Sequence, residues 1–452
     1  MELLPDDALL EVMKYLKIED LLACRLVCRR LGALAMLPEL WRHQRFKLVC
    51  GDETPRYNEC SVLRLAPCLR AWHVNVPLEK FHTLYSTTRC AVNKLTLSLN
   101  NVSGKDALQA SLVIRNQAAL GRLRRLSLGP CSWKSVLDDV EAAVLLGTVA
   151  STPGLEELKI EGFLSFAPSL LDGLHRSFPG ASLKSFEHHP QSPDEEPFCD
   201  LILSTHAATL ESVSLGYYPL ISTSASTLLA GMPHLRRLRC GMMPGLEAVA
   251  GCEQLRLLHL CVAYDGEALA TAEFLRRATQ LLKVRLQCVP YVGMAPSSDM
   301  DFVLALAATG RSHLEDLSIN VEDWHQDHIP QQQQSLLKAL PRLPALKHLE
   351  VHGEANDELL LGITPANAPA LRTLNVFTIS SVECAHDALH RGAVQKLLSL
   401  NPELEFSTYV QSYCSTGGRC AWCSLGCHQE MRDDTLCDNA DWFTIPRWEI
   451  VE

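Results

Sequence analysis

The apolar positions of the chain repeat with a recurring spacing from residue 92 onward. Each copy has an aliphatic residue, two variable residues, a second aliphatic residue, one variable residue and a third aliphatic residue. The full copies are Val92-Leu95-Leu97, Leu123-Leu126-Leu128, Leu155-Leu158-Ile160, Leu210-Val213-Leu215, Leu235-Leu238-Cys240, Leu255-Leu258-Leu260, Leu281-Val284-Leu286, Leu314-Leu317-Ile319, Leu346-Leu349-Val351 and Leu371-Leu374-Val376, and Leu183-Phe186 is a degraded copy. The mean period is about 28 residues. This period predicts an α/β chain of stacked strand–helix units, because no single unit can bury its apolar face alone.

The spacing resembles the strand of leucine-rich repeats. The resemblance implies a solenoid of about 11 repeats over residues 92–410, with parallel strands on the concave face and helices on the convex face. The intervals are uneven, and only Asn100 and Cys131 supply the Asn or Cys of the stricter pattern, so we expect an irregular arc. Polar connections at 188–198, 289–300 and 321–334 are predicted to be loops.

Variable residues beside the middle aliphatic position of each strand should point away from the helices, because strand side chains alternate between faces. In consecutive copies these positions hold Arg237 and Arg239, then His259, then Lys283 and Arg285, before acids appear at Asp316 and Glu350. A run of cations on an acidic protein can recognise an acidic or phosphorylated segment through charge-assisted hydrogen bonds. We therefore treat the five basic residues as candidate substrate-binding residues. The alternative is that they only keep the strand face soluble.

The first 47 residues show helical spacing of a different kind. Pro5 suits a first helical turn, and the acids that follow it suit the positive end of a helix dipole. Three short helices are predicted. The first carries Leu9, Val12, Met13 and Leu16, the second carries Leu22, Leu26, Val27 and Leu31 with Glu19 or Asp20 as its cap, and Pro38 opens the third. A unit this small buries little surface, which leaves some apolar residues for a partner.

The motifs in this stretch resemble the F-box. They are Leu4-Pro5, Tyr15-Leu16, Glu19-Asp20-Leu21-Leu22, Val27-Cys28-Arg29-Arg30 and Pro38-Glu39-Leu40-Trp41. The resemblance implies that residues 1–47 bind a Skp-type adaptor, which in turn holds a cullin and its RING partner. The positions that the resemblance assigns to adaptor binding are Leu4, Pro5, Leu9, Leu10, Leu16, Leu21, Val27, Cys28 and Trp41.

Together the two patterns resemble F-box and leucine-rich repeat proteins, the substrate receptors of Skp–cullin–F-box ubiquitin ligases. The chain then divides into an F-box (1–47), a helical linker and cap (48–91), the solenoid (92–410) and a Cys- and Trp-rich cap or tail (411–452). The resemblance implies a non-catalytic subunit that binds a client protein. Two alternatives stay open: an interaction scaffold outside a ligase, and a protein with a structural zinc site in its tail.

Composition limits the other function classes. The formal net charge of −11 argues against nucleic acid as the main partner, because such proteins usually present a basic face to phosphates. No apolar run approaches the roughly 20 residues of a membrane span, and the acidic N-terminus does not resemble a signal peptide. We expect a cytoplasmic or nuclear protein whose 18 cysteines are mostly reduced and buried.

The tail concentrates possible metal ligands. Cys420, Cys423, Cys427 and Cys437 are the preferred zinc candidates, although only the first two have the usual spacing of a ligand pair. The alternative is a reduced segment that caps the solenoid, and we expect neither a metal nor another cofactor. No phosphate-binding glycine loop, zinc-protease motif or nucleophile elbow occurs, so no enzyme active site is predicted.

Overall fold

The structure is a computed structural model, and its sheet is built from the predicted strands. It describes residues 4–47, 59–76, 82–99, 104–131, 139–162, 180–189, 195–216, 223–262, 267–288, 301–308, 313–321, 329–353, 355–378, 390–410 and 442–444. The chain divides into two compact units, Met1–Leu215 and Gly216–Glu452. Each unit is described separately below.

The first unit begins with four short helices rather than the three predicted. They are α1 (Asp6–Met13), α2 (Ile18–Val27), α3 (Arg29–Ala35) and α4 (Pro38–Trp41). The predicted second helix is interrupted because Cys28 has an extended backbone, and its Sγ accepts a hydrogen bond from Leu31 N (3.5 Å) as the N-cap of α3. The α2 helix has Lys17 at its N-cap, so Glu19 and Asp20 lie in its first turn and do not cap it.

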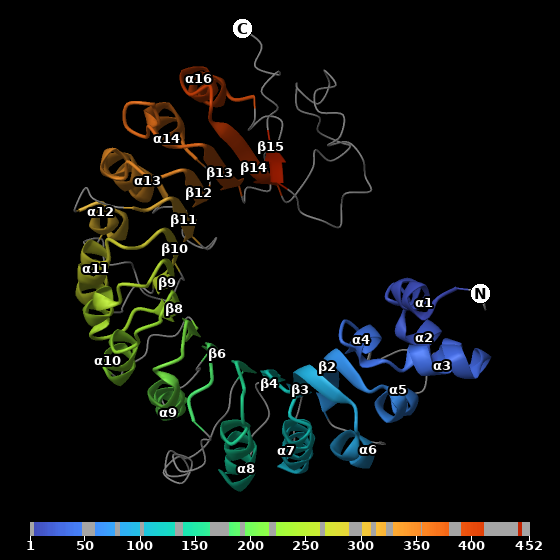
Figure 1. The fold of residues 1–452 in the computed structure, drawn as a ribbon. Helices are drawn as coiled ribbons and strands as arrows, with labels where there is room; N and C mark the ends of the chain where they lie inside the picture. The colour runs from blue at the N-terminus through green and yellow to red at the C-terminus, as the bar shows by residue number, and fades with distance from the viewer. Residues whose placement is uncertain are drawn as a thin grey trace, which may run out of the picture. The chain divides into compact units, whose positions relative to one another are not determined.

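Within the described residues, the first unit continues with seven parallel strands. They are β1 (Arg45–Lys47), β2 (Cys68–Val76), β3 (Ala91–Leu99), β4 (Arg125–Cys131), β5 (Glu157–Gly162), β6 (Ser185–His188) and β7 (Ser212–Ser214). The helices between them are α5 (Glu59–Leu65), α6 (His82–Thr87), α7 (Gly104–Ala119), α8 (Asp139–Ala150) and α9 (Glu196–His206). Figure 1 shows α6 to α9 on one side of these strands.

The sheet starts earlier than the repeat spacing predicts. Strand β1 lies within residues 1–47, and β2 lies within the stretch predicted to be a helical linker and cap. The β2 strand has the repeat spacing at Leu69, Trp72 and Val74, all buried. The aliphatic spacing does not reveal β2, because Trp72 occupies the position of the middle aliphatic residue.

The second unit repeats the arrangement. Strands β8 (Arg237–Gly241), β9 (Leu257–Val262), β10 (Lys283–Cys288), β11 (Asp316–Val321), β12 (His348–His352), β13 (Thr373–Thr378) and β14 (Glu405–Val410) are parallel, and β15 (Trp442–Thr444) is antiparallel to β14. The helices are α10 (Ser224–Ala230), η3 (Leu246–Gly251), α11 (Ala268–Arg277), α12 (Phe302–Leu306), α13 (Ile329–Ala339), η5 (Leu340–Arg342), α14 (Asp357–Gly362) and α16 (Gly392–Leu400). In Figure 1 they line one side of the strands.

The middle aliphatic residues of the repeats lie in register and form the core. In the first unit Leu95, Leu126, Leu158, Phe186 and Val213 pair in sequence, and all are buried. The same row in the second unit is Leu238, Leu258, Val284, Leu317, Leu349 and Leu374. All eleven predicted strands are confirmed, and with them the α/β fold class of strand–helix repeats.

One predicted loop is partly wrong, because α13 begins at Ile329 and includes the glutamine run. Gln333 is buried, and its Oε1 accepts a hydrogen bond from Asn356 N (3.0 Å). A polar run can therefore belong to a helix when a side chain satisfies the backbone of the next unit. None of the described helices is long and apolar enough to cross a membrane.

Candidate functional site

The nine residues that the F-box resemblance assigns to adaptor binding divide by burial. Leu4, Pro5, Val27 and Cys28 are exposed, and Leu10 and Leu16 are half-buried. Leu9, Leu21 and Trp41 are buried and belong to the core of the helical module, together with Met13, Ile18, Leu34 and Leu40. Trp41 Nε1 donates a hydrogen bond to Ala35 O (2.7 Å), so its polar atom is satisfied inside the module.

Three further exposed apolar residues were not among the predicted site residues. Val12 is 59% exposed, Tyr15 is 88% exposed and Leu26 is 83% exposed, compared with 69% for Val27. Val12 lies in the last turn of α1, and Tyr15 follows just beyond the end of the helix. The helical spacing placed Val12 in the buried stripe, and its exposure corrects that prediction.

A contact from α3 to the start of α1 holds the exposed residues in place. Arg30 Nε donates to Asp6 Oδ1 (2.7 Å), and its other guanidinium nitrogen donates to Leu4 O (2.5 Å). Since Arg30 follows the α2–α3 break directly, this contact puts Leu4 at the same end of the module as Cys28. We call Leu4, Val12, Tyr15, Leu26, Val27 and Cys28 the exposed apolar set. Exposed apolar residues on a small module are typical of a protein-binding surface.

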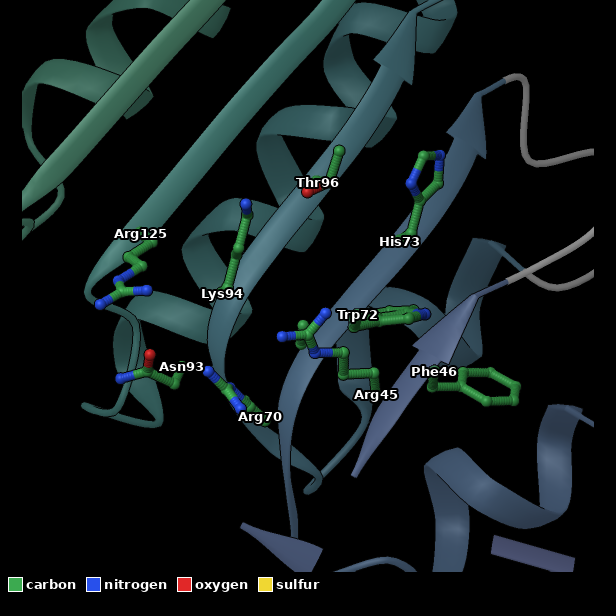
Figure 2. A pocket seen from close by; sticks show the side chains of 10 residues that line it. Arg45, Phe46, Arg70, Trp72, His73, Asn93, Lys94, Thr96 and Arg125 are labelled. Atoms are coloured by element: carbon green, nitrogen blue, oxygen red, sulfur yellow. The ribbon is translucent and has the colours of Figure 1, made fainter. Parts of the chain in front are cut away.

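A second candidate site lies on the face of the first unit's sheet that points away from the helices, here called the open face. A pocket of about 270 Å³ is lined by Arg45, Phe46, Arg70, Ala71, Trp72, His73, Asn93, Lys94, Thr96 and Arg125, and Figure 2 shows these side chains over β1 to β4. We call it the basic pocket. Arg45, Ala71, Lys94 and Arg125 occupy one row of the sheet register, which is why three cations converge there.

His73 lines the basic pocket and contacts two polar side chains beside it. His73 Nε2 lies 2.9 Å from Ser98 Oγ and 3.3 Å from Asn75 Oδ1, so a hydrogen-bond network orients the ring. The site was missed in the sequence because two of its strands, β1 and β2, precede the first repeat that the aliphatic spacing detects. The signal that could have found it is the Leu69-Trp72-Val74 spacing.

The five predicted substrate-binding residues lie together on the open face of the second unit. The register gives two rows there: Arg237, Leu257, Lys283 and Asp316 in one, and Arg239, His259, Arg285, Ser318 and Glu350 in the other. Each row reaches an acid after its cations, at Asp316 and at Glu350, as the sequence predicts. Lys283 Nζ lies 3.0 Å from Asp316 Oδ2, and an Arg285 guanidinium nitrogen lies 3.6 Å from Glu350 Oε1.

Electrostatics within this face further limit its positive charge. Burial lowers the pKa of His259 to about 4, and neighbouring Arg239 and Arg285 lower it too, against a hydrogen bond to Gln287 Oε1 (2.8 Å). His259 is therefore neutral at pH 7. The hydrogen bond from His352 (2.8 Å) holds the pKa of the Glu350 carboxyl below its usual value, with smaller help from Ser318 (3.0 Å) and Arg285. Glu350 stays ionised and offsets the charge of Arg285.

The zinc candidates Cys420, Cys423, Cys427 and Cys437 lie outside the described residues. Within the described ranges, no group of three or more His, Cys, Asp or Glu side chains could hold a metal ion. The prediction about the tail therefore stays a prediction.

Comparison with known proteins identifies the N-terminal module. A family model described as F-box-like matches residues 1–47. No curated protein sequence matches the chain.

Among solved structures, the yeast Rad7 and Elc1 complex is similar, with 13% sequence identity and a TM-score of 0.39 over 70% of this chain and 79% of that chain. An internalin from Listeria monocytogenes is similar with 15% identity and a TM-score of 0.38, over 75% of this chain and 86% of that chain. The mouse RP105/MD-1 complex is similar with 13% identity and a TM-score of 0.30, over 74% of this chain and 63% of that chain.

The motif order, the small helical module and the family match agree with one another. The in-register strands and the flanking helices agree with the repeat spacing. Residues 1–47 of this chain thus belong to the F-box-like domains, and they precede strand–helix repeats of the leucine-rich type.

Proposed function

We propose that this chain is the substrate-recognition subunit of a Skp–cullin–F-box ubiquitin ligase. The observation that carries the proposal is the exposed apolar set on an F-box-like module, since these side chains gain by burial against a partner about 25 cal/mol for each Å² removed from water. The partner is a Skp-type adaptor, and through it a cullin and its RING subunit. The chain acts in the cytoplasm, the nucleus or both.

The repeats then bind the client protein on the open face. Arg237, Arg239, His259, Lys283 and Arg285 are proposed client contacts in the second unit. The chain carries out no bond chemistry. It raises the effective concentration of the client near the ubiquitin-charged enzyme, and the ubiquitinated client goes to the proteasome.

Co-purification of the full chain with a Skp-type adaptor and a cullin tests the proposal. The informative variant is Leu26→Asp with Val27→Asp, because both side chains are exposed and their replacement leaves the core of the module intact. We expect this variant to lose the adaptor, since two charges would be buried without partners in the interface. The matched control is Leu269→Asp in α11, a leucine that is 74% exposed on the other unit.

The control should recover the adaptor as the natural chain does, and all three proteins should unfold at similar temperatures. Failure of the natural chain to recover any adaptor while it is folded would favour the interaction scaffold outside a ligase. Equal recovery with the double variant would show that the exposed apolar set is not the docking surface.

A further inference from the structure

The basic pocket on β1 to β4 carries positive charge that its surroundings leave largely uncompensated. The described residues that line it include the cations Arg45, Arg70, Lys94 and Arg125 and no carboxylate. Arg125 Nε lies 3.2 Å from Glu157 Oε1 on the next strand. Within the described part of the chain, the side chains of Arg45, Arg70 and Lys94 make no ion pair. Four like charges around one hollow repel one another, and a bound anion relieves that repulsion.

On the open face of the second unit, by contrast, two of the basic residues are already compensated by carboxylates. There Lys283 pairs with Asp316 and Arg285 pairs with Glu350, so each of these cations already has a carboxylate at 3.0 to 3.6 Å. An anionic ligand would have to compete with these acids. The basic pocket therefore offers the stronger site for an anion, although the sequence pattern pointed to the second unit.

The pocket suits a phosphoryl group better than a single carboxylate. A phosphorylated side chain carries close to two negative charges and three acceptor oxygens, which several cationic donors can share. Asn93 and Thr96 add neutral hydrogen-bonding groups to the wall (Figure 2). The volume of about 270 Å³ also leaves room for residues on either side of the phosphate.

A peptide is a better candidate for this ligand than nucleic acid. The chain has a formal net charge of −11, and proteins that bind nucleic acid usually present an extended basic face. Here the cations gather around one hollow. Beyond the pocket, Glu157 and Glu161 on β5 and Glu187 on β6 supply carboxylates, which would repel a long phosphate backbone.

We infer that the basic pocket binds a phosphorylated serine or threonine in a segment of the client protein. The inference rests on the proposed function, because it gives the client's chemistry and assumes that the open face receives it. Arg45, Arg70 and Lys94 pair with the phosphate, and Arg125 either leaves Glu157 or shares its guanidinium between the two anions. Client recognition is then switched on by a kinase.

The experiment uses the purified full chain and two degenerate nonapeptide libraries that differ only in a central phosphoserine or serine. We expect the phosphoserine library to bind at least about tenfold more tightly, the loss that removing one charge-assisted contact typically causes. Arg45→Glu with Lys94→Glu should abolish that preference. Arg276→Glu with Arg277→Glu makes the same change of charge and should keep it, because these two exposed cations lie on α11 in the second unit.

Equal binding of the two libraries, or a preference that survives Arg45→Glu with Lys94→Glu, would overturn the inference. Inorganic phosphate binding as tightly as the phosphoserine library would also overturn it, since the site would then hold a free anion. Tighter binding of a single-stranded RNA 20-mer would point to nucleic acid instead. Adaptor recovery from the same preparations separates the two proposals: loss of the phosphate preference with the adaptor retained contradicts only this inference.

Discussion

Cys28 is exposed at the break between α2 and α3, whereas most cysteines with described surroundings are buried free thiols. The buried ones are Cys68, Cys90, Cys199, Cys240, Cys252, Cys261 and Cys288. Burial raises the pKa of the Cys90 thiol to about 12, and burial also raises the pKa of Cys240, with a smaller effect of Cys261. The thiols of Cys90 and Cys240 therefore stay protonated at neutral pH. All seven of these buried cysteines serve as small apolar core groups.

Exposure therefore predicts the order of alkylation. In the native chain, iodoacetamide should modify Cys28 readily, and Cys90 and Cys240 only after unfolding, because both access and the thiolate fraction are low there. Peptide mass spectrometry after timed labelling measures the rates. Bound adaptor should protect Cys28 and leave the others unchanged. Native labelling of Cys90 as fast as Cys28 would contradict the burial argument.

At the scale of elements, a polar side chain ties each of α7 and α9 to the start of the strand before it. Gln117 on α7 accepts a hydrogen bond from Val92 N (2.9 Å) and donates one to Cys90 O (3.1 Å). His206 on α9 plays the corresponding part, because its Nδ1 accepts from Ser182 N (3.1 Å) and Leu183 N (3.4 Å). These bonds satisfy backbone groups that no neighbouring strand reaches.

A second contact, between His188 and Glu195, joins β6 to the start of α9 and is almost completely buried. His188 on β6 places Nε2 3.0 Å from Glu195 Oε2 at the start of α9, and both side chains are almost completely buried. Such a pair is costly to break from one side, because the remaining group is left polar and unpaired. We expect Glu195→Ala to lower the free energy of unfolding by about 3 kcal/mol. Urea denaturation measures this, and a change below about 1 kcal/mol would contradict it.

His206 makes the stability of this repeat depend on pH. Burial lowers its pKa to about 4, below the ordinary value of 6.5, so the unfolded chain binds the proton first. This contribution to stability is complete above pH 6.5 and is lost as the pH falls toward 4. His206→Gln should flatten the fall of the unfolding midpoint between those pH values, since Gln117 shows that glutamine can make the same bond.

Thermal unfolding of both proteins from pH 7 to pH 4 checks this prediction. His259 and Glu350 titrate in either protein and cancel in the comparison. Identical slopes for the natural chain and the variant would show that His206 does not carry the effect.

The sequence predicts the repeated elements well and their exceptions poorly. Spacing alone places all eleven predicted strands, because buried aliphatic residues at positions such as Leu126 and Leu158 define each unit. The spacing fails at Trp72, where an aromatic ring fills an aliphatic position, and at Cys28, where the backbone turns within an apolar run. Both exceptions are local: an aromatic ring replaces an aliphatic residue at Trp72, and a cysteine acts as a helix cap at Cys28, a role that its residue type does not announce.

At the scale of the whole molecule, we propose different partners for the two candidate sites. A partner of the exposed apolar set would gain by burying apolar surface, whereas a ligand of the basic pocket would gain by pairing with positive charge. Sequence motifs locate the module that carries the first site, because the F-box order is specific, but they do not assign Val12, Tyr15 or Leu26 to that site. They do not locate the second, since Arg45, Ala71, Lys94 and Arg125 become neighbours only through the register of β1 to β4.

The two sites should act independently. No described hydrogen bond or ion pair joins Leu26 or Val27 to the cations of the basic pocket, and sites without shared partners usually add within about 0.5 kcal/mol. Leu26→Asp with Val27→Asp should therefore leave the affinity for the phosphoserine library within about twofold. Conversely, the variant with Arg45→Glu and Lys94→Glu should co-purify with the adaptor as well as the natural chain does. A change of tenfold in either cross-test would reveal coupling between the sites.

The antiparallel strand β15 also matters for how the protein behaves in a crowded solution. An outermost strand presents unpaired amide and carbonyl groups, which can recruit strands from other molecules and start aggregation. Thr408 and Tyr409 of β14 are paired with Phe443 and Trp442, so a short segment of the same chain occupies that edge. Removing residues 442–444 would expose this edge of β14 to strands from other molecules. We therefore expect β15 to reduce self-association of the protein.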